Sequence, residues 1–197
     1  MIELVIGGAR SGKSDYAQRQ ALAADLRVTY LATAQALDTE MATRIAHHRA
    51  RRPARWRTVE EPLRLADALR REAADDACLL VDCLTLWLTN VLLAGRDEEI
   101  DKLLAVLPGL PGHILLVSNE VGWGIVPENA LARRFRDEQG RLNQRIAAVP
   151  MEPNGLLVAL QGHGLLVNVL THAPFGVREH LADTGIVAGE DRQQLVA

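Results

Sequence analysis

Residues 7–14, GGARSGKS, match the spacing G-x-x-x-x-G-K-S/T of a phosphate-binding loop. In this motif the glycines let backbone N–H groups converge on phosphate oxygens, the lysine supplies a point charge, and the hydroxyl suits Mg²⁺. A glycine-rich turn that matches by chance is the alternative. An apolar run at residues 2–6 precedes the motif, however, and a polar, alanine-rich stretch at 13–24 follows it. This order of strand, loop and helix favours a nucleotide site that uses Lys13 and Ser14.

Asp82 directly follows the apolar run at residues 78–81, CLLV. Such a run is typical of a strand buried on both faces of a sheet. A carboxylate at its end can hold Mg²⁺ directly or through water, or it can cap the helix that follows. The phosphate-binding motif upstream favours the metal role.

Residues 44–57, RIAHHRARRPARWR, place two adjacent histidines among closely spaced arginines, in a chain of formal net charge −3. If the segment is helical, Arg44, His47 and Arg51 share one face. Neighbouring guanidinium groups favour a neutral imidazole, which is a competent nucleophile toward phosphorus, and they neutralise the phosphate under attack. A histidine pair in a basic helix is also typical of a solvated surface or an anion-binding patch, and the spacing does not decide between these interpretations.

Glu60 and Glu61 lie in the segment TVEEP. Their carboxylates can accept hydrogen bonds from a ribose or a base edge. They can also begin a helix at Pro62, where acidic side chains suit the helix dipole. From the residues alone, the helix-start interpretation is favoured.

The elements that must position these residues alternate along the chain. We expect strands at residues 2–6, 27–34, 78–82 and 113–120, and helices at 13–24, 39–52, about 63–69, 84–94, 98–107 and about 130–148. This alternation predicts an α/β fold with a mostly parallel sheet covered by helices. Ligands bind at the carboxyl ends of such strands, which here carry residues 7–14, 32–34, 82 and 119–120.

The length of 197 residues predicts a single domain. A net charge of −3 provides no general attraction for nucleic acid or an anionic membrane surface, so neither partner is expected. No apolar run approaches the ~20 residues that span a bilayer, and no basic leader begins the chain. Cys78 and Cys83 have the spacing of neither a disulfide framework nor a metal site, which is typical of a reducing cytoplasm.

Six motifs follow one another in a distinctive order. They are GGARSGKS, ATA at 32–34, IAHHRARRP, WRTVEEP, LTLWLTNVLL, and the block SNEVGWGIVPENALARRFRDEQGRLNQRIAA at 118–148. In this order they resemble the bifunctional adenosylcobinamide kinase and adenosylcobinamide-phosphate guanylyltransferase of cobalamin assembly, across about residues 1–148. The resemblance implies a RecA-like P-loop NTPase fold, commonly a homotrimer, that uses ATP, GTP and Mg²⁺. It implies phosphorylation of the aminopropanol hydroxyl of adenosylcobinamide, followed by transfer of GMP from GTP to that phosphate.

The resemblance also implies roles for individual residues. His47, the first histidine of the pair, becomes guanylylated, and Lys13 acts in catalysis. Ser14 and Asp82 are implied as metal ligands, and Glu60 as a GTP ligand rather than a helix-start residue. Arg133, Arg134 and Arg136 either assist or form a surface face. The implied nucleotide-binding set is Gly7, Gly8, Ala9, Arg10, Ser11, Gly12, Lys13, Ser14, Ala32, Thr33, Ala34, His48, Arg49, Ala50, Arg51, Glu60 and Asp82.

Residues 149–197 depart from the family pattern, so we expect residues 1–148 to form the catalytic P-loop domain and the tail to form no separate domain. GLLVAL at 155–160 and GLLVNVL at 164–170 are apolar enough to supply a last strand, although Pro150 and Pro153 interrupt the approach. Without that strand, an exposed sheet edge would lower stability and disturb a trimer interface. The tail histidines, His163, His172 and His180, lack the spacing of metal ligands and receive no role.

Two further function classes stay open. One is a nucleotide-binding switch or regulatory subunit that docks a partner through the basic helix. The other is a simple small-molecule P-loop kinase without a covalent step. Neither class needs a nucleophilic imidazole, so the chemistry of the histidine pair distinguishes them from the bifunctional enzyme.

Overall fold

The fold is built on one seven-stranded sheet. The computed structural model describes residues 1–50, 52–149, 156–161 and 165–170. The sheet has the strand order β3-β2-β4-β5-β1-β6-β7. Its strands are β1 (Ile2–Gly7), β2 (Arg27–Ala32), β3 (Arg57–Glu60), β4 (Ala77–Asp82), β5 (His113–Asn119), β6 (Leu156–Gln161) and β7 (Leu165–Leu170). Neighbouring strands from β3 to β6 run parallel, and β7 is antiparallel to β6.

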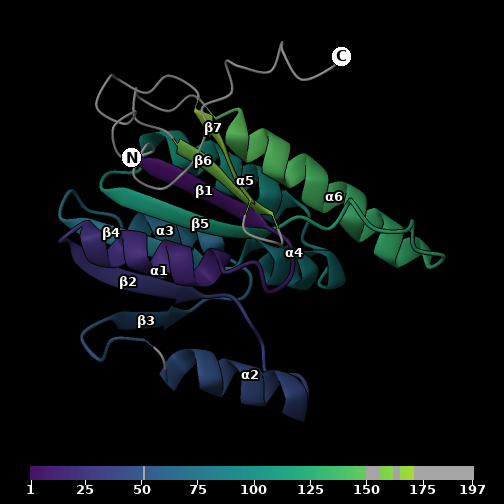
Figure 1. Ribbon diagram of the computed structural model, residues 1–197, viewed down its shortest axis with the longest axis horizontal. Coiled ribbons are helices and arrows are strands. Elements are labelled where there is room, and N and C mark those ends of the chain that lie inside the picture. The colour runs from purple at the N-terminus through teal and green to yellow at the C-terminus, as the bar shows by residue number, and fades with distance from the viewer. Residues whose placement is uncertain (51, 150–155, 162–164, 171–197) are drawn as a thin grey trace.

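Helices cover both faces of this sheet (Figure 1). They are α1 (Lys13–Ala23), α2 (Thr39–Ala50), α3 (Leu65–Glu72), α4 (Leu84–Leu93), α5 (Glu98–Val106) and α6 (Ala130–Ala147), with the short 3-10 turn η1 (Leu107–Gly109). The apolar side chains form two clusters, because successive residues of a strand point to opposite faces. From β4, Leu79 and Val81 join the cluster with α3 to α6, whereas Cys78 and Leu80 join the cluster with α1.

The strand order separates the phosphate-binding motif from the acidic strand. β5 pairs with both β1 and β4, so it lies between the strand that leads to residues 7–14 and the strand that ends at Asp82. The predicted α/β fold class, with a mostly parallel sheet covered by helices, is therefore confirmed. The carboxyl ends of β1, β2 and β4 lie along one edge, where the sequence places most of the candidate site residues.

Helix α2 lies apart from the helices that pack on the two faces of the sheet. Figure 1 shows it beyond β3, at the edge of the sheet. The carboxylate of Asp38 accepts a hydrogen bond from the Met41 N–H at 2.7 Å and so caps its first turn. None of its residues is buried. Only Met41, Ile45 and His48 are half-buried, so the segments that enter and leave the helix also contribute to its position.

Several elements differ from the sequence-based prediction. β3 was not predicted, because its four residues, RTVE, give too short a pattern to distinguish an edge strand from a loop. β2 ends at Ala32 and α2 ends at Ala50, each two residues earlier than predicted.

The sheet continues past residue 148. β6 pairs with β1 and β7 pairs with β6, so strands that begin within GLLVAL and GLLVNVL cover the sheet edge beside β1. The division of the chain at residue 148 stays a prediction. Pro150, Pro153 and the three tail histidines lie outside the described residues.

Candidate functional site

The loop between β1 and α1 has the backbone of a phosphate cradle. Gly12, directly before α1, has φ +84°, a left-handed conformation that glycine adopts readily. No side chain caps the N-terminus of α1, so its first N–H groups are available to an anion. In the described part of the chain, the buried hydroxyl of Ser11 also lacks a hydrogen-bond partner. These groups together fit a phosphate.

Lys13 places its ammonium group beside this loop. Its Nζ donates a hydrogen bond to the carbonyl oxygen of Gly8 at 3.1 Å. Burial lowers the pKa of Lys13, while Cys83 and Asp82 oppose that shift. An anion beside Nζ would favour the charged form further. The lysine is thus placed for the phosphate contact that the sequence predicts.

Asp82 lies opposite the loop, with both carboxylate oxygens engaged. Ser14 Oγ donates to Oδ1 at 3.3 Å, and Tyr30 Oη donates to Oδ2 at 2.8 Å. The alternative role for Asp82, capping α4, does not apply, because Cys83 is the N-cap and no side chain caps that helix.

The hydroxyl of Ser14 and the carboxylate of Asp82 are oxygen donors of the kind that Mg²⁺ prefers. Within the described residues no group of three or more His, Cys, Asp or Glu side chains could hold a metal. These two donors therefore fit a metal that takes its other ligands from phosphates and water.

The buried Thr33, which follows β2, is hydrogen-bonded to the backbone of Cys83, which follows β4. Its Oγ1 donates to the Cys83 carbonyl at 2.7 Å and accepts from the Cys83 N–H at 3.0 Å. Asn90 Nδ2 donates to the Thr33 carbonyl at 2.8 Å. The Thr33 side chain is buried and occupied within the protein, whereas Ala32 and Ala34 are partly exposed. Thr33 therefore fixes the geometry of this edge.

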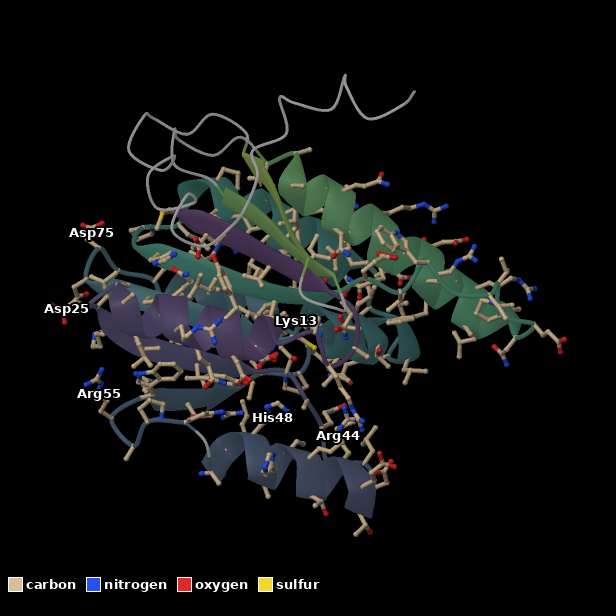
Figure 2. All side chains as sticks on the ribbon, in the orientation of Figure 1. Lys13, Asp25, Arg44, His48, Arg55 and Asp75 are labelled. Carbon is tan, nitrogen blue, oxygen red and sulfur yellow. The ribbon has the colours of Figure 1, made fainter. Side chains whose placement is uncertain are left out.

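The two histidines of α2 have different surroundings. His47 is exposed and His48 is half-buried, and their ring centroids are 6.3 Å apart at an interplanar angle of 84°. Figure 2 shows the side chains of Arg44 and His48 extending from α2 toward the side of the molecule on which Lys13 lies. Arg49 and Ala50 are exposed, and Arg51 lies outside the described residues. Both histidines lie on the helix that the sequence predicts.

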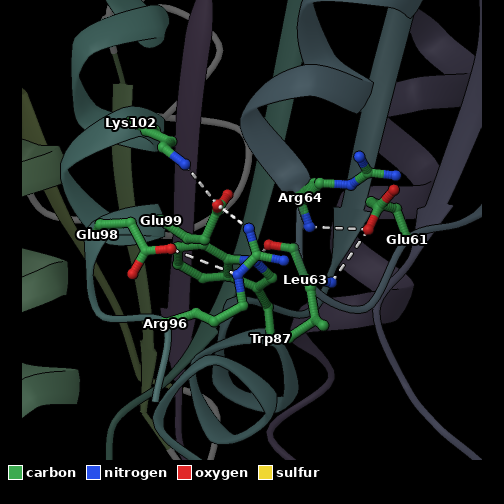
Figure 3. Close-up of polar contacts among 8 residues, drawn as sticks. All are labelled: Glu61, Leu63, Arg64, Trp87, Arg96, Glu98, Glu99 and Lys102. Atoms are coloured by element: carbon green, nitrogen blue, oxygen red, sulfur yellow. Dashed lines mark hydrogen bonds and ion pairs between the residues drawn. The ribbon is translucent and has the colours of Figure 1, made fainter. Parts of the chain in front are cut away.

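The two glutamates at the end of β3 have separate roles. Glu61 Oε1 accepts hydrogen bonds from the N–H groups of Leu63 and Arg64, at 3.1 and 2.8 Å, just before α3 (Figure 3). Glu60 is exposed and lies opposite Ala32 in the register of β2 and β3. The helix-start role therefore falls to Glu61, which leaves the carboxylate of Glu60 facing solvent at the edge where the strands end.

Residues to which the sequence assigns no individual role also meet at this edge. The Glu120 N–H donates to the Gly7 carbonyl at 3.0 Å, and the buried Oδ1 of Asn119 has no partner among the described residues. Tyr30 contacts Asp82 through its hydroxyl, and desolvation, with Asp82 as a second cause, raises the pKa of Tyr30 far above its ordinary value. A tyrosine within an apolar strand is the signal for this contact, because a buried phenol needs a hydrogen-bond partner.

The arginines at the start of α6 make local contacts instead. Arg133 donates to the carbonyl oxygens of Pro127 and Glu128. Arg134 pairs with Asp97 at 2.8 Å, and Arg136 pairs with its neighbour Asp137 at 3.0 Å. These contacts favour the surface-face interpretation of the three arginines.

The sequence is similar to known proteins over most of its length. The model of a family described as cobinamide kinase / cobinamide phosphate guanyltransferase matches residues 3–163, beyond residue 148 at which the resemblance seen in the motifs ends. In Pseudomonas aeruginosa, the bifunctional adenosylcobalamin biosynthesis protein CobP is 55% identical over 173 residues, which cover 84% of this chain and 100% of that protein. The proteins named CobU from Salmonella typhimurium and Escherichia coli are 46% and 44% identical over 170 residues, covering 77% of this chain and 93% of each.

Among solved structures, the RadB recombinase matches with a TM-score of 0.40 and 16% identity, over 88% of this chain and 81% of that chain. In the described part of the chain, no helix combines the length and apolar character needed to cross a membrane.

The family match includes the phosphate-binding loop, the histidine pair of α2 and Asp82. The chain therefore belongs to the cobinamide kinase / cobinamide phosphate guanyltransferase family.

Proposed function

We propose that this protein phosphorylates the aminopropanol hydroxyl of adenosylcobinamide and then transfers GMP from GTP to that phosphate through a guanylylated His47. One observation carries the proposal. The chain combines a complete phosphate cradle with an exposed histidine on a basic helix, within a family that has both activities. The product is adenosylcobinamide-GDP.

In the kinase step, the described residues supply positioning and charge. Lys13 and the uncapped N-terminus of α1 hold the phosphates of the nucleoside triphosphate. Ser14 and Asp82 would hold Mg²⁺, which would neutralise charge on those phosphates. The substrate hydroxyl attacks the terminal phosphorus, the bond to the nucleoside diphosphate breaks, and the hydroxyl proton leaves to solvent or a nearby base.

In the guanylyl transfer, His47 is the nucleophile. An unprotonated ring nitrogen attacks the α-phosphorus of GTP, and the bond to pyrophosphate breaks. The resulting phosphoramidate is then attacked by a phosphate oxygen of adenosylcobinamide phosphate, which releases the imidazole. Exposure of His47 supports this role, because a corrinoid phosphate is too bulky to reach a buried ring. The exposed cations Arg44 and Arg49 supply positive charge on the same helix.

The proposal also includes the nucleotide-binding residues, cosubstrates, location and oligomeric state that the family resemblance implies. The nucleotide-binding residues are those of the loop at 7–14, the strand end at 32–34, the segment 48–51, Glu60 and Asp82. GTP, ATP and Mg²⁺ are the cosubstrates and metal. The protein acts in the cytoplasm as a homotrimer. Neither nucleic acid nor membrane insertion has a part in the reaction.

The experiment that tests this function uses GTP labelled at its α-phosphate. We expect acid-labile, alkali-stable label on the denatured wild-type protein and none on His47→Ala. His48→Ala is the comparison variant, since it removes the adjacent imidazole from the same helix. Because His48 belongs to the proposed nucleotide-binding set, this variant should slow labelling without abolishing it. Both variants should still phosphorylate adenosylcobinamide. Label that survives in His47→Ala would exclude His47 as the nucleophile, and an unlabelled wild-type protein would favour the switch or the plain kinase.

A further inference from the structure

We propose that Tyr30 is a positioning residue for both the metal site and the histidine helix. Its hydroxyl orients the carboxylate of Asp82, and its ring binds the side chain of Arg52 and so anchors the end of α2. The inference rests on the proposed function, because it assigns the two contacts of Tyr30 to the kinase metal site and to the guanylylated helix. It gives roles to Tyr30 and Arg52, to which the family resemblance assigns none.

The hydroxyl contact fixes the carboxylate. Tyr30 is only 2% exposed, and its Oη donates to Asp82 Oδ2 at 2.8 Å. Ser14 Oγ donates to the other oxygen at 3.3 Å. A carboxylate held at both oxygens has a defined orientation, and the two donors come from different elements, β2 and α1. Loss of the Tyr30 hydroxyl would leave Oδ2 without this donor and free the carboxylate to rotate.

The ring of Tyr30 contacts a cation, Arg52, whereas its hydroxyl contacts a carboxylate. The guanidinium carbon of Arg52 lies 3.5 Å from the centroid of the Tyr30 ring, which is a close cation–π contact. In the described residues, the buried Nε of Arg52 has no hydrogen-bond partner. The Arg52 N–H donates to the Arg49 carbonyl at 3.2 Å, which joins the stacked residue directly to the last turn of α2.

An anchor at this end matters for α2, because none of its residues is buried and only Met41, Ile45 and His48 are half-buried. The chain returns to the protein core only after the helix ends. Arg52 stacks on Tyr30, and Trp56, 7% exposed, packs into the apolar cluster that also contains Tyr30. The position of His47 relative to the phosphate loop therefore depends on this exit segment. A change at Arg52 should displace the histidine helix and leave the phosphate loop and Asp82 in place.

Separate substitutions can test the two contacts. Tyr30→Phe removes the hydroxyl and keeps the ring, whereas Arg52→Gln removes the cation and keeps the hydroxyl contact. Two quantities are measured in the full-length protein. One is the Mg²⁺ concentration for half-maximal binding of a fluorescent ATP analogue. The other is the rate of His47 labelling by α-labelled GTP at saturating Mg²⁺.

We expect Tyr30→Phe to raise the half-maximal Mg²⁺ concentration by about tenfold and to keep the labelling rate within about twofold of the wild type. Arg52→Gln should slow labelling by about five- to tenfold with the Mg²⁺ requirement unchanged. Arg55→Gln is the matched control, since Arg55 is an exposed arginine of the same loop. Figure 2 shows Arg55 far from both Lys13 and His48, so this variant should match the wild type in both assays.

Tyr30→Leu should impair both quantities, and adding Arg52→Gln to it should slow labelling no further, since the stack is already lost. A thermal melt of each variant shows whether it is folded. Labelling by Arg52→Gln at the wild-type rate would overturn the ring contact, and an unchanged Mg²⁺ requirement in Tyr30→Phe would overturn the hydroxyl contact. If the wild-type protein takes no label, the proposed function fails, while the Mg²⁺ assay still tests the role of the hydroxyl.

Discussion

The left-handed conformation of Gly12 gives a quantitative test of how the phosphate loop is built. With φ at +84°, any residue with a Cβ atom is strained at this position. A Cβ built on Gly12 meets no heavy atom within 4 Å, so backbone strain is the only source of cost. That strain amounts to about 1–2 kcal/mol for an alanine. For a chain of this size, each kcal/mol lowers the melting temperature by about 2–4 °C, so Gly12→Ala should melt about 2–8 °C lower.

Gly8→Ala is the matched control, because Gly8 lies in the same loop, also has open space around its Cβ position, and does not have a positive φ. Gly8→Ala should melt within about 1 °C of the wild type. Gly12→Asn should lose less stability than Gly12→Ala, since asparagine tolerates the left-handed region better. The assay is thermal unfolding of the nucleotide-free protein. Equal losses for Gly8→Ala and Gly12→Ala would refute the reasoning, because strain at Gly12 would then not be the cause.

Two other predictions follow from buried charges. Glu99 is buried and its Oε1 accepts from Arg96 and Lys102 at 2.8 Å each (Figure 3), so Glu99→Gln should cost about 2 kcal/mol in thermal or urea unfolding, a discounted value because both partners are partly exposed. Glu98→Gln, in an exposed pair on the same helix, should be neutral, and a comparable loss there would contradict the burial argument. Because burial lowers the pKa of Lys13, the unfolded chain binds more protons at this side chain between that lowered pKa and 10.5, so the contribution of Lys13 to stability should grow as pH rises through this interval, whereas the buried tyrosines and cysteines, whose pKa values burial raises, act in the opposite direction. In urea titrations at several pH values, the stability of the wild type relative to Lys13→Met should therefore rise with pH, and a difference that does not change with pH would contradict the prediction.

The parts of the fold that the sequence predicts share a physical cause. β4 and β5 contain continuous apolar runs and the run in β1 is interrupted only by Glu3, because both faces of these strands are covered, and such runs can be recognised without a partner strand. The phosphate loop is equally legible, since its backbone geometry requires glycines at a fixed spacing. β3 is different. It is an edge strand with half-exposed residues, and pairing with β2 rather than local pattern makes it a strand.

The residues of the site likewise fall into those that the sequence predicts and those that it does not. Lys13, Ser14 and Asp82 lie in motifs and could be predicted, and the structure brings them to one edge of the sheet. Glu61 could not be separated from Glu60 by type or spacing. The difference arises because the Glu61 carboxylate reaches two N–H groups before α3, whereas Glu60 is the last residue of β3. The choice between them depends on where the strand ends, which the sequence pattern leaves open by one residue.

Tyr30 shows why some positioning residues escape sequence analysis. In the sequence it is one apolar residue of a buried strand, and its contribution to the core accounts for its presence. Its second role depends on the register of β2 with β4, in which Ala32 lies opposite Asp82. The tyrosine two residues earlier is long enough to reach the carboxylate, and its ring face stays open to Arg52 from the segment after α2. β2, β4 and the segment after α2 are distant in sequence, and they must come together before Tyr30 can make both contacts. This role is therefore visible only in the folded chain.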